Sequence, residues 1–406
     1  MSIAIDPDTK VADLLISYPE TAAVFAANGM EALVSEDGRR VLAPFLTLGT
    51  ALRSRSIAPE SFLRLLVEAA SGGALLDAPG LADIRRQGDL RLLALLPCGL
   101  KVPFGRAISA FLEELPKEGG PKIRYAVEGN LNQELSYYPY ISRIEAASEL
   151  PDIIVSADFN AFYYHDFQKR FVDTGDFAAP VELETTGSFQ AAGIIDPLRQ
   201  YFVFGINPLV IVADLDRLEG RPLPECWRDL QDPVWKRSIC LRGNADFFCH
   251  AVLLPIFQEH GAQGLRRLGP NVRQGLHPAQ MVKQIDAGGE AALYVMPEFF
   301  AHRVKNRERI RILWPEDGAL ASPVTLQVKK SRAAELQPVL DYLCGPEMAK
   351  VLSGARFPVP HAAVEGPLQG RPLKWLGWDY MRKNDIAALN REIDAVFVPA
   401  VGGIFE

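Results

Sequence analysis

Hydrophobic residues recur at helical spacing through the first part of the chain, as at Val11, Leu14 and Leu15. Pro19 and Pro59 each precede a further run of this kind, and proline is common in the first turn of a helix. The pattern predicts a small all-α domain over residues 1–70. Residues 71–90 contain a Gly-Gly pair and a mixed polar stretch, which predicts a linker.

From residue 91 onward the pattern alternates between strands and helices. Leu92–Leu96 is a short apolar run typical of a buried strand, and Pro97–Lys101 leads from it into a helix predicted near 104–115. Alternation of this kind predicts α/β lobes with mainly parallel sheets. Further strands are predicted at 122–128, 150–158, 201–213 and in a short run that ends at Arg242.

Composition narrows the class of protein. The chain has 406 residues with 43 Lys and Arg against 50 Asp and Glu, a net charge of −7. With no basic block, nucleic acid and anionic membranes are not expected partners. No apolar run approaches the roughly 20 residues that span a bilayer. Residues 1–8 lack the basic and apolar regions of a secretory signal, which predicts a cytoplasmic protein, with the periplasm as the alternative if another route exports it.

The cysteines do not form a recognisable disulfide framework. There are five of them, an odd number, and none forms a Cys-x-x-Cys pair, so we expect free thiols that are mostly buried. The chain also lacks Gly-x-Ser-x-Gly, Walker, Gly-x-Gly-x-x-Gly and His-Glu-x-x-His motifs, and we predict no enzyme and no cofactor.

One segment carries a family resemblance. After the apolar run Tyr201–Ala213 comes Pro222–Lys236, with a tryptophan before Asp-Leu and then Asp-Pro-x-Trp-Lys. This closely resembles the second-lobe entry of solute-binding proteins of ABC importers. The resemblance implies a two-lobed type II periplasmic-binding-protein fold that closes over a small ligand and does no chemistry. It implies a first lobe at 91–205 and 325–406, a second lobe at 206–324, and hinge strands near 204–211 and 321–330.

The subgroup that the chain resembles binds ferric iron, thiamine or polyamines. Ferric-iron members present two adjacent tyrosines where this chain has Phe299 and Phe300, and phenylalanine cannot ligate a metal. The resemblance therefore does not extend to bare ferric iron. Residues 1–70 are similar to a small helical domain of unknown function that usually carries a cysteine pair, but Glu31–Glu36 contains none. What remains is a docking or oligomerisation module, or a packed helical appendage.

The resemblance implies that ligand binds where loops follow strands. The four candidate loops are residues 97–100, 156–160, 242–250 and 276–281, and in each of them a structural role is the alternative to ligand contact. Asp158, Asn160, Asn244, Asp246 or His277 can each cap a helix instead, and Gly99 can serve a simple turn. Arg242 suits a carboxylate or phosphate. The predicted ligand-binding residues are Cys98, Gly99, Ser156, Asp158, Asn160, Arg242, Asn244, Asp246, His277, Gln280 and Glu316.

The leading functional prediction is a solute-binding protein for a small polar or charged molecule or ion, with an ABC permease or a protein docked by the N-terminal domain as partner. One alternative is a cytoplasmic metal or metal-cofactor carrier, in which Cys98, Cys249, His250 and His277 converge. Another is a metabolite-sensing docking protein. The residues name neither the ligand nor the oligomeric state.

Overall fold

The computed structural model describes residues 5–34, 39, 43, 46–55, 57, 59–70, 90–129, 141, 144, 146–147, 150–182, 187–244, 247–364, 366 and 368–402. The chain divides into two compact units. One comprises residues 1–93, 123–126 and 130–151, and the other residues 94–122, 127–129 and 152–406. Each is described by itself. In the part of the chain that is described, no helix is both long and apolar enough to cross a membrane.

The N-terminal helical region is confirmed. Val11, Leu14 and Leu15 all face the interior, and the Phe25 and Phe62 rings meet edge to face at 5.4 Å. The helices come from the predicted segments because each contributes one apolar face to this core. They are α1 (Val11–Ser17), α2 (Thr21–Ala27), α3 (Glu31–Val34), α5 (Leu48–Ser54) and α6 (Pro59–Ala70).

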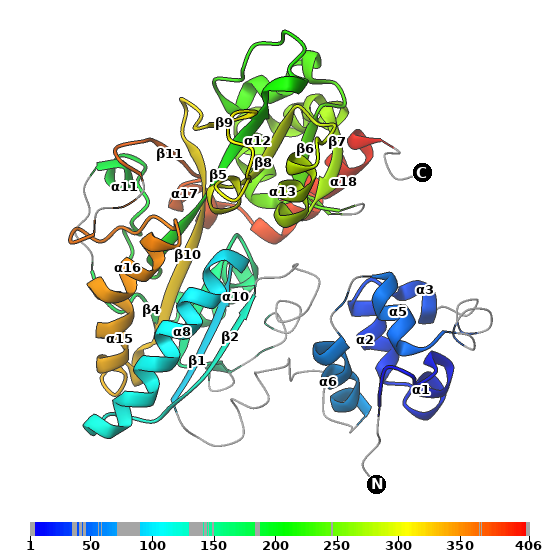
Figure 1. Cartoon of the computed structure of the whole chain (residues 1–406). Coiled ribbons are helices and arrows are strands. Elements are labelled where there is room, and N and C mark those ends of the chain that lie inside the picture. Colours follow the sequence, from blue (N-terminus) through cyan, green and yellow to red (C-terminus); the bar gives the residue numbers. More distant parts are fainter. Residues whose placement is uncertain are drawn as a thin grey trace. The chain divides into compact units, whose positions relative to one another are not determined.

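The remainder is an α/β fold around one mixed sheet, as Figure 1 shows. Its strands follow the order β2-β1-β3-β10-β5-β8-β6-β7, with β4 and β11 on β10 and β9 on β5. The strands are β1 (Leu90–Leu96), β2 (Ile123–Gly129), β3 (Ile153–Ala157), β4 (Phe177–Ala178), β5 (Phe202–Asp214), β6 (Ile239–Arg242), β7 (Val272–Leu276), β8 (Leu293–Pro297), β9 (Ile310–Leu313), β10 (Ala319–Lys329) and β11 (Leu373–Lys374).

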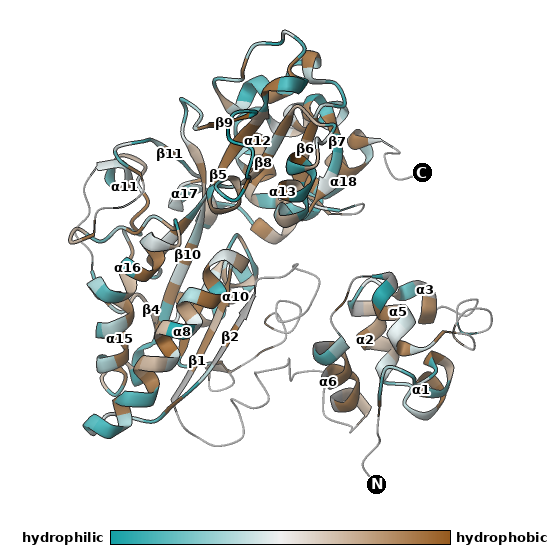
Figure 2. Ribbon diagram, in the orientation of Figure 1, coloured by the Kyte–Doolittle hydropathy of each residue, from teal (hydrophilic) through white to brown (hydrophobic). Residues whose placement is uncertain are grey.

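Helices cover this sheet. Figure 2 shows hydrophobic and hydrophilic residues in turn along α8, whose buried positions Leu100, Phe104, Ile108 and Leu112 recur at helical spacing. The helices are α8 (Cys98–Glu114), α10 (His165–Phe167), α11 (Gly187–Ala191), α12 (His250–Leu268), α13 (Pro278–Asp286), α14 (Glu298–Ala301), α15 (Gln337–Cys344), α16 (Pro346–Gly354), α17 (Trp378–Lys383) and α18 (Ile386–Val401).

Two long antiparallel strands, β5 and β10, run through the centre of the fold, and both are buried along their whole length. They occupy the positions predicted for the hinge. Pro222–Lys236 folds after β5 into short 3₁₀ turns that bury Trp227 and Trp235. The Trp227 indole donates to the Gly318 carbonyl at 2.7 Å, which ties this segment to the start of β10.

The last helix, α18, packs against α12. The resemblance places residues 325–406 in the first lobe and α12 in the second, so this contact joins segments of the two predicted lobes. The Phe248 and Phe397 rings meet edge to face at 5.1 Å, and His250 Nε2 lies 2.9 Å from Asp394. Burial of the apolar face of α18 on α12 explains this placement.

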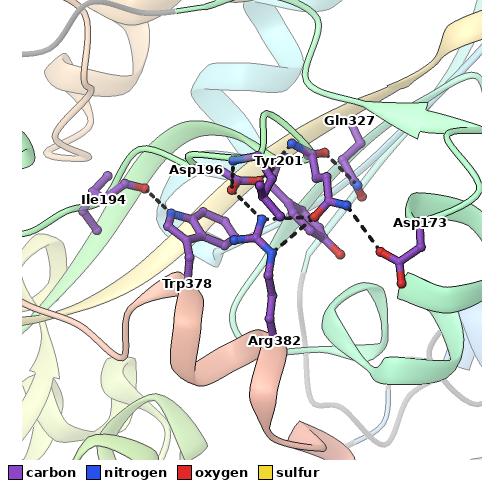
Figure 3. A network of polar contacts seen from close by, with 9 residues as sticks. Asp173, Ile194, Asp196, Tyr201, Gln327, Trp378 and Arg382 are labelled. Atoms are coloured by element: carbon purple, nitrogen blue, oxygen red, sulfur yellow. Dashed lines mark hydrogen bonds and ion pairs between the residues drawn. The ribbon is translucent and has the colours of Figure 1, made fainter.

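A polar network joins α17 to the base of the hinge strands (Figure 3). The Asp196 carboxylate is fully buried, accepts from the backbone of Leu198, Gln200 and Tyr201, and pairs with Arg382. The Trp378 indole donates to the Ile194 carbonyl at 2.9 Å. Gln327 of β10 donates to the Gln200 carbonyl at 3.1 Å, so the network reaches both β5 and β10.

Candidate functional site

The four predicted loops supply residues that lie together. Cys98 begins α8, Asp158 follows β3, Arg242 ends β6, and His277 precedes α13. Cys98 Sγ lies 4.0 Å from His277 Nε2, and Arg242 Nη1 lies 3.5 Å from Asp158 Oδ2. We call Cys98, Asp158, Arg242, Cys249 and His277 the loop cluster. The first two belong to the predicted first lobe and the other three to the predicted second lobe.

Asp158 is held firmly in this cluster. Its backbone is left-handed, with φ of 66°, which aspartate tolerates better than most residues. Its N–H donates to the Pro323 carbonyl at 3.1 Å, and its carboxylate accepts from the Ser322 hydroxyl of β10. The carboxylate is thus tied to a hinge strand and directed at Arg242.

His277 is the N-cap of α13. Its Nδ1 accepts from the Ala279 N–H at 3.2 Å, so the neutral imidazole carries its proton on Nε2 and donates toward Cys98 Sγ. Burial lowers the pKa of His277, and Arg242 lowers it further. The ring is therefore neutral at pH 7.

Both thiols of the loop cluster are also neutral. Burial raises the pKa of Cys98, although Arg242 and Lys101 act to lower it. Burial likewise raises the pKa of Cys249 against the effect of Arg242. Cys249, which the sequence suggested only as part of the alternative metal site, is the residue before α12, and its sulfur lies 3.7 Å from Arg242 Nη1. Ser322 was missed, because its place beside Asp158 depends on strand pairing.

Gly99 provides a close approach between the lobes. A Cβ at this position would lie 2.6 Å from Phe299 Cδ1, closer than real contacts allow. Phe299 comes from α14, and Arg303 stacks on its ring at 4.1 Å from the centroid. Glu298, next to Phe299 and almost fully buried, lies 3.3 Å from Arg371 and 3.9 Å from Arg356, which follows α16.

Other predicted residues have local structural contacts. Asn160 caps a short 3₁₀ turn by accepting from the Phe162 N–H, and Ser156 is buried in β3 opposite Thr325. Asn244 accepts from the Phe247 N–H at 2.8 Å and so closes its own loop. Gln280 accepts from the His277 N–H, completing a capping box. Whether these four contact ligand stays a prediction.

Glu316 is exposed, and its N–H donates to the Glu225 carbonyl at 2.8 Å, in the loop between β9 and β10. Asp246 lies outside the described residues.

A pocket of about 250 Å³ near the start of β5 is lined by Val181, Ile195, Phe202 and other residues. Four of its charged groups already pair, Glu182 with Arg199 and Asp196 with Arg382.

The arrangement does not support a metal carrier. Within the described ranges, no three His, Cys, Asp or Glu side chains are grouped to hold a metal ion. His250, one of the residues expected to converge, directs Nε2 to Asp394 of α18 instead. Phe299 and Phe300, at the position of the expected tyrosine pair, offer no ligating atoms.

Two lobes joined by paired hinge strands, with polar loops facing each other, define a periplasmic-binding-protein fold. Residues 148–384 match the model of bacterial extracellular solute-binding proteins, and the chain belongs to this family. Residues 5–63 match a domain of unknown function, DUF1858. None of the curated proteins matches the chain significantly.

Solved structures support the fold. Iron- and citrate-bound IdiA (FutA) of Trichodesmium is 14% identical with a TM-score of 0.55, over 77% of this chain and 99% of that chain. Apo ferric ion-binding protein A of Pasteurella haemolytica is 15% identical with a TM-score of 0.55, over 77% and 98%. The ferric binding protein of Campylobacter jejuni is 14% identical with a TM-score of 0.54, over 77% and 99%. At these identities the likeness concerns the fold.

A pH titration tests the neutral state of His277. Its folded pKa lies below the ordinary value of about 6.5, so the unfolded chain binds the proton more readily. The contribution of neutral His277 to the free energy of unfolding is therefore present above a pH of about 6.5 and is lost as the pH falls below this value. We expect His277→Asn, which keeps a capping side chain without titrating, to lose less stability than wild type between pH 7.5 and 5.5. Parallel curves from urea denaturation would contradict this.

Proposed function

We propose that this solute-binding protein captures a small polar solute between its two lobes at the loop cluster and releases it unchanged. The observation that carries the proposal is the meeting of loops from both predicted lobes, Cys98 with His277 and Asp158 with Arg242. A solute that enters between such loops bonds to both lobes at once, so binding favours the closed state.

The experiment is a thermal shift screen of the full chain against a metabolite library, followed by small-angle scattering on any hit. A ligand that binds only the folded state adds about 2.7 kcal/mol to the free energy of unfolding at a hundredfold excess over Kd, and this raises Tm. We expect a raised Tm and a smaller radius of gyration. A library without hits, or a hit that is chemically altered after incubation, counts against the proposal.

We further propose an ABC permease as the partner, as the family suggests. A metabolite-sensing docking role for the N-terminal domain remains a second prediction. A pull-down with the full chain and with a chain beginning at residue 85 separates the two. Identical partners for both chains would leave the helical domain without a docking role.

The cytoplasmic location also remains a prediction, and the family's description as extracellular gives the periplasm weight as the alternative. Fractionation of cells that express the unmodified gene measures it directly.

A further inference from the structure

Arg242 and Asp158 face each other from the two predicted lobes. Arg242 ends β6, Asp158 follows β3, and their side chains are 20% and 12% exposed. Both groups are therefore largely withdrawn from water without being fully buried. A charged pair in this setting is available to a solute in a way that a fully buried pair is not.

The Arg242 guanidinium is only partly used. In the described part of the chain its side-chain hydrogen bonds run through Nη1 alone, to Asp158 Oδ2 at 3.5 Å and to Cys249 Sγ at 3.7 Å. Charge-assisted N–H···O bonds are normally about 2.7–2.9 Å long. Nε and Nη2 have no described partner, and a guanidinium edge matches the two oxygens of a carboxylate.

Asp158 limits what this edge can accept. Ser322 and the Pro323 carbonyl hold Asp158 in place, so its carboxylate stays close to any group on Arg242. A purely anionic solute on Arg242 would be repelled by Asp158. A purely cationic solute on Asp158 would be repelled by Arg242.

The other three residues of the loop cluster add no charge to this pair. Burial keeps Cys98 and Cys249 as thiols and His277 as a neutral imidazole. The loop cluster thus presents one positive and one negative group side by side. The Phe299 ring lies close to Gly99, which follows Cys98 in the first turn of α8. This charge balance matches a solute that carries both signs.

We infer that the solute is a small zwitterion whose carboxylate binds Arg242 and whose ammonium group binds Asp158. This inference rests on the proposed solute-binding function. On closure, the long Arg242–Asp158 contact between the predicted lobes is replaced by shorter charge-assisted bonds to the solute, and both charges remain paired.

The test uses the full chain and probes of matched size. Glycine, β-alanine and 4-aminobutanoate carry both charges at increasing separation, whereas butanoate and butylamine each keep one charge of 4-aminobutanoate. We expect at least one zwitterion to raise Tm by several degrees, and butanoate and butylamine to leave it nearly unchanged. Asp158→Asn, which preserves side-chain size, and Arg242→Gln, which leaves a shorter uncharged polar side chain, are checked for folding by circular dichroism.

The variants distinguish the possible results. Asp158→Asn should weaken binding of the active zwitterion at least tenfold and should strengthen binding of butanoate, because the repulsion is gone. Arg242→Gln should weaken the zwitterion and leave butanoate without binding. Asp379→Asn, whose side chain is highly exposed on α17, is the control and should bind as wild type does.

Three results would overturn the inference. One is a wild-type response to butanoate equal to that of 4-aminobutanoate, and another is an unchanged affinity in Asp158→Asn. The third is a metabolite-library hit without both charges while no zwitterion binds, which refutes the inference and leaves the proposed function intact. Absence of any hit in probes and library counts against both.

Discussion

Replacing Gly99 with valine is expected to hold the two lobes apart. A Cβ at this position meets Phe299 at 2.6 Å from Cδ1 and 2.7 Å from Cε1, and valine adds two further methyl groups. Overpacking of this kind costs about 1–3 kcal/mol, which corresponds to roughly tenfold to hundredfold weaker ligand binding. Hydrogen exchange followed by mass spectrometry should show faster exchange in peptides that contain Cys98 and His277.

Two further variants make this result specific. Gly105→Ala lies on the same helix, but its new Cβ meets only Val127 at an ordinary 3.8 Å, so it should exchange as wild type does. Phe299→Ala added to Gly99→Val removes the obstructing ring and should restore slow exchange. Faster exchange that persists in the double variant would mean that the valine disturbs α8 itself.

The largest loss of stability is expected from Asp196→Ala. This carboxylate is fully buried, pairs with Arg382 and accepts three backbone N–H groups at the base of β5 (Figure 3). Removal of one partner leaves a partly buried guanidinium and several donors unsatisfied, at a cost of about 3–5 kcal/mol. Urea denaturation measures the change in the free energy of unfolding.

The matched control is Asp379, which lies one turn from Arg382 on α17. Asp379 pairs with Lys383, but both side chains are highly exposed, so Asp379→Asn should leave the free energy of unfolding unchanged. Equal effects of the two substitutions would show that the network around Asp196 contributes little. A decrease in the free energy of unfolding that occurs in Asp196→Ala and not in Asp379→Asn would show that this network stabilises the base of the hinge.

Local chemistry made much of the fold predictable from sequence. Pro278 after His277 correctly indicated a helix start with His277 as its cap, and the apolar runs at 92–96 and 201–213 became β1 and β5. The helix predicted near 104–115 begins earlier, at Cys98, because Pro97 directly precedes its first turn. These features depend on residues that are neighbours in the sequence, so the sequence alone predicts them.

Features that depend on distant segments were not predictable in the same way. Ser322 reaches Asp158 only because β10 pairs with β3, and His250 leaves the loop cluster because α18 brings Asp394 to it. The capping role of Gln280 has a local signal, since it stands three residues after the cap. The convergence of the four loops followed from the fold, whereas the identities of the contacting pairs required coordinates.

The position of α18 has a consequence for biosynthesis. This helix is the last one described, yet it completes the surface of α12, which is translated more than a hundred residues earlier. Synthesis must therefore reach residue 401 before α18 can cover α12, while the N-terminal helices can fold soon after they emerge. During that interval the apolar face of α12 is exposed, which makes nascent chains of this protein candidates for chaperone binding.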